Sequence, residues 1–68
     1  MRTAVIVSYF ERRGFGFLRP DDDGQQRFFH ISNFCGDGRE PSAGMRVAYE
    51  ENFDRRKQRP CAVAVKPL

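Results

Sequence analysis

The sequence predicts an all-β fold in which five short antiparallel strands form one small barrel. Segments rich in β-branched and aromatic residues recur at close intervals, and Gly, Pro and Asp residues separate them. No window keeps apolar residues at the i, i+3, i+4 spacing of an amphipathic helix. A chain of 68 residues is also short, and a domain of about this size buries only about 60% of its unfolded surface. We therefore expect residues 1–68 to form a single domain.

Two strands are expected in the first third of the chain. Residues 3–10 are β-branched and aromatic, and the polar turn at residues 11–13 follows them. The second strand is expected at residues 14–19, where Pro20 stops it. The run Asp-Asp-Asp-Gly at residues 21–24 is a strong turn signal. This pattern predicts a strand–turn–strand unit that leads into a third strand.

Three further strands complete the expected fold. The third covers about residues 26–31, and a long loop with Gly and Pro residues follows at residues 32–44. The fourth covers about residues 45–53, the basic loop covers residues 54–60, and the fifth strand covers residues 61–66. Five short strands at this spacing are typical of the OB fold, a partly open five-stranded barrel. We predict an all-β, five-stranded antiparallel OB-fold barrel.

Composition favours a binding face over a catalytic cleft. Twelve Lys and Arg residues against nine Asp and Glu residues give a net charge of +3, and the pI is about 9.3. Arginine suits bidentate contact with phosphate and stacking on bases, although ordinary surface charge would give the same net value. The seven Phe and two Tyr residues are more than a small core needs. Some of these rings are therefore expected on the surface, where they mark a binding site.

The most informative motif is the run Arg-Gly-Phe-Gly-Phe-Leu at residues 13–18. Side chains alternate between the two faces of a strand, so Phe15 and Phe17 share one face and Gly14 and Gly16 share the other. Glycine on the inner face allows a close approach of neighbouring groups. The alternative is that the two rings are core and the glycines face water, which would weaken the strand without any gain.

The third strand repeats this pattern. Phe28 and His30 share one face, and Phe29 takes the other. If the second and third strands pair antiparallel, Phe15, Phe17, Phe28 and His30 form one aromatic patch. Single-stranded bases stack on such patches, at about 1–3 kcal/mol per base by alanine substitution, and with little dependence on sequence. His30 alone is also compatible with a structural role.

The two motifs resemble those of a known family. Residues 13–18 look like the first ribonucleoprotein motif of cold-shock domains, and residues 28–31 look like the second, with Arg27 in place of its first Val. The flanks, Val-Ser-Tyr-Phe at residues 7–10 and Pro-Cys-Ala-Val-Ala-Val at residues 60–65, are also similar. Gly-Met-Arg-Val, which enters the fourth strand, resembles the family there too. The chain thus resembles the bacterial cold-shock proteins over nearly its whole length.

The resemblance implies a sequence-tolerant single-stranded RNA- and DNA-binding protein. It implies an RNA chaperone that acts on RNA secondary structure, with effects on transcription or translation. In this role the rings stack on bases, and Arg13 and the basic loop contact phosphate. The implied nucleic-acid-binding residues are Tyr9, Arg13, Phe15, Phe17, Phe28, His30, Arg56 and Lys57.

Besides Arg27, three residues depart from the family pattern. Tyr9 stands where the family has a stacking Trp, Ser8 where it has Lys, and Ile31 where it has Phe. We expect these changes to reduce the aromatic area, with additional arginines as an offset. The cations expected to line the patch or its rim, unless they are merely solvated, are Arg12, Arg13, Arg27, Arg55, Arg56, Lys57 and Arg59.

Alternation does not settle the inward face of every strand. It leaves Phe10, Phe29 and Ile31 open. The side chains expected to form the core are Val5, Val7, Phe10, Phe29, Val47, Val63 and Val65.

Other functional classes fit the sequence less well. A nuclease would have His30 as its only histidine, with no recognisable pair of carboxylates and no base–nucleophile pair. A zinc site of His30, Cys35 and Cys61 has no Cys-x-x-Cys spacing and no fourth ligand. The alternative that stays open is a small β-barrel that binds peptide through its aromatic face. We expect no enzymatic activity, no cofactor and no metal.

The remaining expectations concern location and partners. No segment reaches the roughly 18 apolar residues of a membrane span, and residues 4–7 are too short for the core of a signal peptide. Cys35 and Cys61 are expected as free thiols in a reducing compartment. We therefore expect a cytoplasmic monomer whose partners are single-stranded RNA and DNA, with no membrane and no small-molecule substrate.

Overall fold

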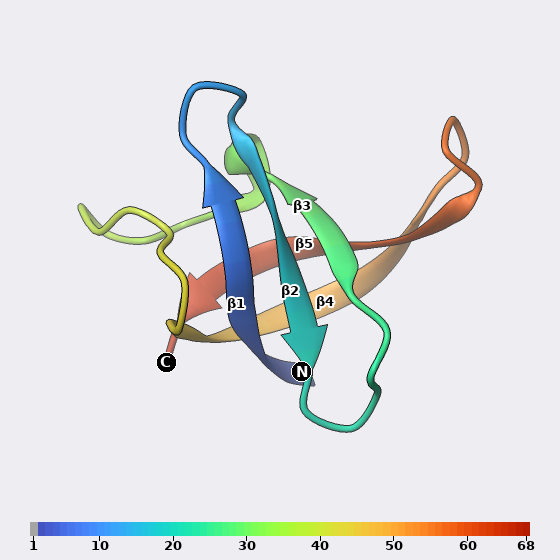
Figure 1. Ribbon diagram of the computed structural model, residues 1–68, viewed down its shortest axis with the longest axis horizontal. Coiled ribbons are helices and arrows are strands. Elements are labelled where there is room, and N and C mark those ends of the chain that lie inside the picture. The colour runs from blue at the N-terminus through green and yellow to red at the C-terminus, as the bar shows by residue number, and fades with distance from the viewer. Residues whose placement is uncertain (1) are drawn as a thin grey trace.

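The computed structural model describes residues 2–68, in which five strands close into a barrel (Figure 1). The neighbours around the barrel follow the order β1-β2-β3-β5-β4. A single 3-10 turn, η1, comes after β3 and is the helical element of the described residues. The elements are β1 (Arg2–Phe10), β2 (Phe15–Pro20), β3 (Arg27–His30), η1 (Ile31–Asn33), β4 (Arg46–Asp54) and β5 (Arg59–Pro67). The predicted all-β, five-stranded OB-type barrel is confirmed, and its strands lie close to the predicted positions.

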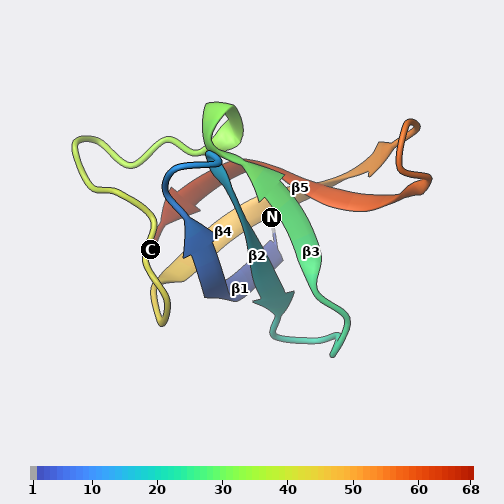
Figure 2. The same ribbon diagram turned by 45° about the horizontal axis from the view of Figure 1, so that its top comes forward.

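The prediction of a purely antiparallel sheet is wrong at one junction. The β3 and β5 strands run parallel where Phe28 pairs with Cys61, and Figure 2 shows β5 passing β3 at an angle. The other four strand pairs are antiparallel. The reason is geometric: strand direction cannot alternate all the way round a closed ring with an odd number of strands. One parallel pair is therefore required once the five strands close.

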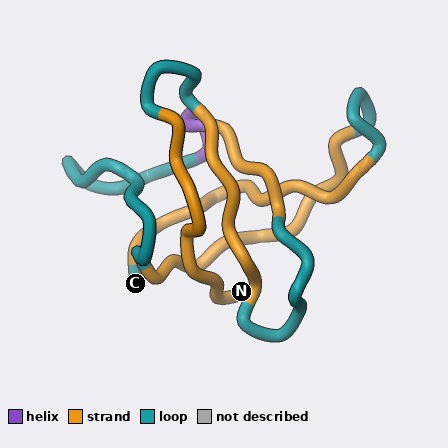
Figure 3. The backbone as a smooth tube through the Cα atoms, viewed as in Figure 1, coloured by secondary structure: helices purple, strands orange, loops and turns teal. Residues whose placement is uncertain are grey.

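The hairpin of β4 and β5 extends beyond the barrel wall. The pairing of β4 with β1 ends at Tyr49, whereas its pairing with β5 continues to Asp54. Residues 52–60 therefore form a two-stranded projection, which we call the hairpin arm. Figures 1 and 3 show it as the segment that reaches farthest from the other strands on the side of β3.

The core lies between the strands and is built from small aliphatic residues around two aromatic rings. The predictions for Phe29, Val47 and Val65 are confirmed, because these residues are fully buried. Val5 and Val63 are only half-buried. The buried core cluster consists of Ala4, Ile6, Leu18, Phe29, Val47, Tyr49, Ala62 and Val65.

The assignment of Phe10 and Val7 to the core is wrong. Phe10 is 46% exposed and Val7 is 36% exposed. Ala4 and Ile6 face the core, so Val7 lies on the outer face by alternation. For Phe10 the cause is a β-bulge in β1, where the register with β2 shifts between Ile6 and Ser8. The bulge inserts one extra residue and reverses the inward and outward positions after it. Ile6 therefore faces the core, whereas Phe10 faces outward.

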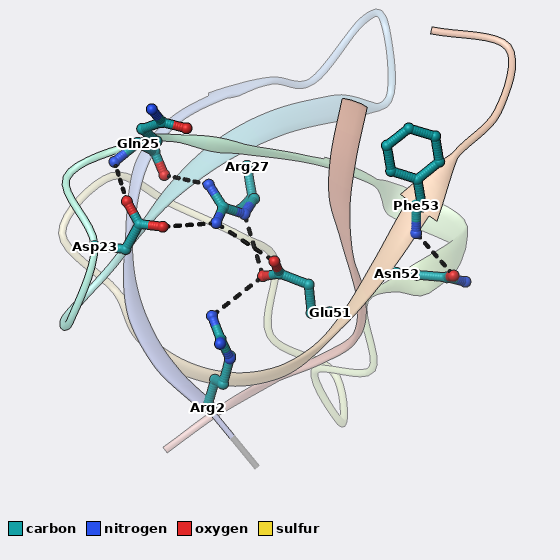
Figure 4. Close-up of polar contacts among 7 residues, drawn as sticks. All are labelled: Arg2, Asp23, Gln25, Arg27, Glu51, Asn52 and Phe53. Carbon is teal, nitrogen blue, oxygen red and sulfur yellow. Dashed lines mark hydrogen bonds and ion pairs between the residues drawn. The ribbon is translucent and has the colours of Figure 1, made fainter. Parts of the chain in front are cut away.

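Arg27 does not lie at the rim of the aromatic patch, as was expected, but is only 5% exposed. It shares the inward face of β3 with Phe29, because side chains alternate along the strand. Its guanidinium pairs with Asp23 (2.8 Å) and with Glu51 (3.1 Å), as Figure 4 shows. Arg2 reaches the same Glu51 carboxylate at 3.4 Å. These ion pairs hold a buried charge at one end of the barrel.

Candidate functional site

Four phenylalanine rings gather on the outer face of β1, β2 and β3. The Phe15 ring centroid lies 5.4 Å from that of Phe10 and 5.3 Å from that of Phe28. Phe17 lies 6.0 Å from both Phe15 and Phe28, with near-perpendicular ring planes. These are the separations of ordinary aromatic pairs. We call Phe10, Phe15, Phe17 and Phe28 the ring cluster.

Strand register places these rings together. Phe10 is paired with Phe15 across β1 and β2, and Phe17 is paired with Phe28 across β2 and β3. Residues that are directly opposite on antiparallel strands project to the same face. The predicted meeting of Phe15, Phe17 and Phe28 is confirmed. The three rings are half-buried, so each leaves part of its surface to the solvent.

Gly16 explains why the rings point outward. A β-carbon at Gly16 would overlap the carbonyl oxygen of Ser8 and would lie 2.9 Å from Cε1 of Phe29. Only hydrogen fits on that inner face, so the side chains on either side of Gly16 must occupy the outer face. The alternative with glycines facing water is thereby excluded for Gly16, which is buried. Gly14 acts differently, because it lies in the β1–β2 turn with φ of 72°, a value that favours glycine.

His30 stands opposite Phe15 at the end of β3. Its Nδ1 accepts a hydrogen bond from the backbone N–H of Ser32 at 3.1 Å and lies 2.9 Å from the Ser32 hydroxyl oxygen. The side chain therefore caps η1. The residue is also exposed, so the capping contact leaves its ring accessible beside Phe15. Both roles considered for His30 are compatible with this geometry.

The structure does not bring Tyr9 into the ring cluster. Tyr9 is paired with Gly16 and lies on the inner face, where its ring stacks on Phe29 at 6.3 Å with 14° between the planes. It is half-buried and packs against the core. The exposed ring on β1 is instead Phe10, which sequence reasoning missed. The β1–β2 turn begins at this residue, because the Phe10 carbonyl accepts hydrogen bonds from the backbone N–H groups of Arg13 and Gly14.

Cations border the ring cluster on two sides. On the β1–β2 side, a shallow hollow of about 290 Å³ is lined by Phe10, Glu11, Arg12 and Arg13. On the side of the hairpin arm, Lys57 Nζ lies 4.1 Å from the centroid of the Phe28 ring. Cations on both flanks are close enough to the rings to contact an elongated ligand that lies on the ring cluster.

The arm supplies a second cation, and its turn is held by hydrogen bonds. The guanidinium carbon of Arg59 lies 5.9 Å from the Phe28 centroid, and Arg56 is exposed at the tip of the arm. Asp54 Oδ1 accepts hydrogen bonds from the backbone N–H groups of Arg56 (2.9 Å) and Lys57 (3.3 Å). This arrangement is an Asx-type turn, which fixes the backbone from which the cations project.

Some of the cations form ion pairs with carboxylates and others do not. Within residues 2–68, the arginines that form ion pairs are Arg2, Arg27 and Arg46, and their partners are Asp21, Asp23 and Glu51. The cations of the β1–β2 turn and of the hairpin arm form no ion pair in the described part of the chain; these are Arg12, Arg13, Arg55, Arg56, Lys57 and Arg59. The positive charge near the ring cluster is therefore available to an anionic partner.

The site carries no metal-binding constellation in the part of the chain that the structure describes. No three His, Cys, Asp or Glu side chains among residues 2–68 lie close enough to hold a metal ion. Cys35 and Cys61 have free thiols. Burial raises the pKa of the Cys61 thiol, and the charges of Asp54 and Glu51 act in the same direction. No helix in the described range is long and apolar enough to cross a membrane.

Comparisons with known proteins agree with this geometry. Residues 3–68 match the family model of the 'Cold-shock' DNA-binding domain. The probable cold shock protein y4cH of Sinorhizobium fredii (strain NBRC 101917 / NGR234) is 37% identical over 57 residues, which cover 82% of this chain and 83% of that protein. The solved structure of drosophila Unr CSD456 superposes with a TM-score of 0.80 at 28% identity. That match covers 98% of this chain but only 26% of the longer one.

Proposed function

Because the chain belongs to the cold-shock DNA-binding domain family, a nucleic-acid-binding family, we propose that it binds single-stranded RNA and DNA with little dependence on base sequence. The observation that carries the proposal is the ring cluster, in which four partly exposed rings lie 5.3–6.0 Å from their neighbours. Every base has a π-face, so such a surface accepts any base that is not already stacked. Bases inside a duplex are stacked on both sides and do not reach it.

The proposed contacts follow the exposure of each side chain. Phe15, Phe17 and Phe28 stack on bases, and the exposed Phe10 extends the platform toward the β1–β2 turn. His30 contributes its ring next to Phe15. Tyr9 is proposed to contribute only the part of its ring that Phe29 does not cover. Its share of the binding energy should therefore be smaller than that of the phenylalanines.

The phosphate contacts are proposed at the two basic flanks. Arg13 lies at the β1–β2 turn, and Arg56 and Lys57 lie on the hairpin arm. The logarithm of the binding constant falls linearly with the logarithm of the salt concentration. For single strands, each neutralised phosphate contributes about −0.7 to the slope of this line. Three contacts would therefore contribute a slope of about −2.

We further propose that the protein acts as an RNA chaperone. A sequence-tolerant surface that holds unpaired bases competes with intramolecular pairing and lowers the stability of RNA hairpins. Effects on transcription or translation would follow from this activity. We propose that the protein acts as a single-domain monomer in the cytoplasm. A fluorescently labelled RNA hairpin should melt at a lower temperature in its presence, and an unchanged melting temperature at saturating protein would contradict the chaperone role.

The experiment that tests binding is fluorescence anisotropy with a labelled pyrimidine-rich single strand and its matched duplex. Titrations at about 50 and 200 mM salt bracket the range in which phosphate contacts weaken strongly. Tight single-strand binding with weak duplex binding is the expected result. Equal binding to both, lost at the higher salt concentration, would leave charge attraction alone. Binding to neither would favour the alternative in which the ring cluster binds a peptide.

A further inference from the structure

The aromatic face of Phe28 is occupied by a cation from the same chain. Lys57 Nζ lies 4.1 Å from the ring centroid, which is the geometry of a cation–π contact. Lys57 is exposed, and no carboxylate within residues 2–68 lies within ion-pair distance of its ammonium group. Within the described residues, the Lys57 ammonium group is therefore held by its cation–π contact with the Phe28 ring.

A base cannot stack on that face while Lys57 covers it. Stacked rings approach to about 3.5–4 Å, and the ammonium group already occupies this space. The guanidinium carbon of Arg59 is farther from the ring, at 5.9 Å from the centroid, and so leaves more space than the lysine. The remaining surface of Phe28 is partly covered by Phe15 at 5.3 Å and by Phe17 at 6.0 Å. A base that binds at Phe28 must therefore displace the lysine.

Displacement requires only side-chain rotation. The backbone of Lys57 is held by its hydrogen bond to Asp54 Oδ1, which a change of side-chain rotamer does not break. Lysine carries its charge on a flexible four-carbon stem. The ammonium group can therefore leave the ring and reach the phosphate of an incoming nucleotide while the hairpin arm stays in place.

The relative strengths of the contacts allow this exchange. An exposed cation–π contact favours the covered state of the ring by roughly two- to fivefold. A base stacked on an aromatic side chain favours the bound state by roughly 5- to 150-fold. The lysine also gains a phosphate contact. We propose that Lys57 covers the stacking face of Phe28 in the free protein, yields it to a base, and then holds the phosphate of the bound strand. This inference rests on the proposed single-strand binding.

The exchange predicts a change of sign in the effect of one substitution. Lys57→Ala removes a phosphate contact but also uncovers Phe28. The variant should bind a labelled hexathymidylate more weakly than the native protein at low salt, and its salt slope should be smaller by about 0.7. Toward about 1 M salt the phosphate contact is screened. There the variant should bind more tightly than the native protein, by roughly two- to fivefold. Equal binding of the two proteins at this salt concentration would contradict the covering of Phe28 by Lys57. The matched control is Lys66→Ala, which alters the other lysine, on β5, and should leave both quantities unchanged.

A second measurement observes Lys57 directly. In the free protein, the ring current of Phe28 should shift the ε-methylene proton signals of Lys57 upfield of those of Lys66, and Phe28→Leu should abolish the difference. Saturation with hexathymidylate should move the Lys57 signals toward those of Lys66. If anisotropy shows saturation while the Lys57 signals stay unchanged, the exchange is wrong and the proposed function stands. If the strand does not bind, both are wrong.

Discussion

The guanidinium of Arg27 and the carboxylate of Glu51 are joined at 3.1 Å, although β3 and β4 are not neighbours in the barrel. Strand β5 lies between them, so this ion pair spans three strands. Arg27 stands where the family motif has a Val. Its guanidinium stays charged inside the barrel because the carboxylates of Asp23 and Glu51 pair with it.

The Arg27–Glu51 pair gives the first prediction. Glu51→Ala should destabilise the fold by about 1–3 kcal/mol, because it leaves a buried guanidinium with one carboxylate partner fewer. The value is below that of a fully buried pair because Glu51 remains one-third exposed. Urea unfolding followed by circular dichroism measures the change. The double variant Arg27→Val, Glu51→Val should regain most of the loss, and a double variant less stable than Glu51→Ala alone would contradict this account.

The second prediction separates binding from stability on β3. Phe28→Ala should weaken single-strand binding by about 1–3 kcal/mol, because a stacking surface is lost. Phe15→Ala should weaken it similarly. Neither change should unfold the protein, since both rings are only half-buried.

The matched control for these substitutions is Phe29→Ala, next in the chain but on the inner face and fully buried. It should cost about 3–5 kcal/mol of stability, which a domain this small can hardly sustain. Thermal unfolding and anisotropy on the same samples distinguish the two effects. Unfolding by Phe28→Ala, with Phe29→Ala tolerated, would mean that the two faces of β3 are reversed.

The third prediction concerns the inner face of β2. Gly16→Ala should destabilise the fold by about 1–3 kcal/mol, toward the upper end of that range, because the new β-carbon meets backbone at Ser8 and ring atoms of Phe29. The control is Gly24→Ala, where no heavy atom lies within 4 Å of the added carbon. Melting temperatures of the two variants should differ clearly. Similar melting temperatures would show that β1 moves to accommodate the methyl group.

The fourth prediction is the behaviour in acid. Hydrogen bonds from Arg46 and Thr3 hold the pKa of Asp21 below its ordinary value. The backbone N–H of Gln25 and then Arg27 do the same for the pKa of Asp23. A carboxylate with a lowered pKa in the folded state stabilises the fold above its unfolded pKa of about 3.9, and this contribution is lost as the pH falls through the folded value.

Stability should therefore decline as the pH falls below about 4. In Asp21→Asn this decline should be shallower than in the native protein. Asp22→Asn is a suitable control, since Asp22 forms no ion pair within the described residues. Urea midpoints measured across the acid range provide the comparison. An Asp21→Asn profile parallel to that of the native protein would contradict the assignment.

The parts of the fold that could be predicted from the sequence depend on local patterns. Turn residues and period-2 alternation located the five strands, and alternation in β2 and β3 identified Phe15, Phe17 and Phe28. Phe10 could not be placed in this way, because one extra residue at the β1 bulge reverses its direction, and the bulge depends on pairing with β2. The sequence shows that Arg27 and Phe29 are two residues apart and therefore lie on the same face of β3. Its partner Glu51 was not, since it comes from a distant segment.

The hairpin arm affects the tendency of the protein to aggregate. Its strands pair with each other, but among residues 2–68 no further strand pairs with the outer edge of β4 beyond Tyr49. Exposed edges of this kind promote sheet growth between molecules, and natural proteins protect them with charge and with proline. Arg55, Arg56 and Lys57 place like charges at the tip of the arm, where β4 ends. The same cations that would attract a nucleic-acid strand therefore oppose aggregation through this edge.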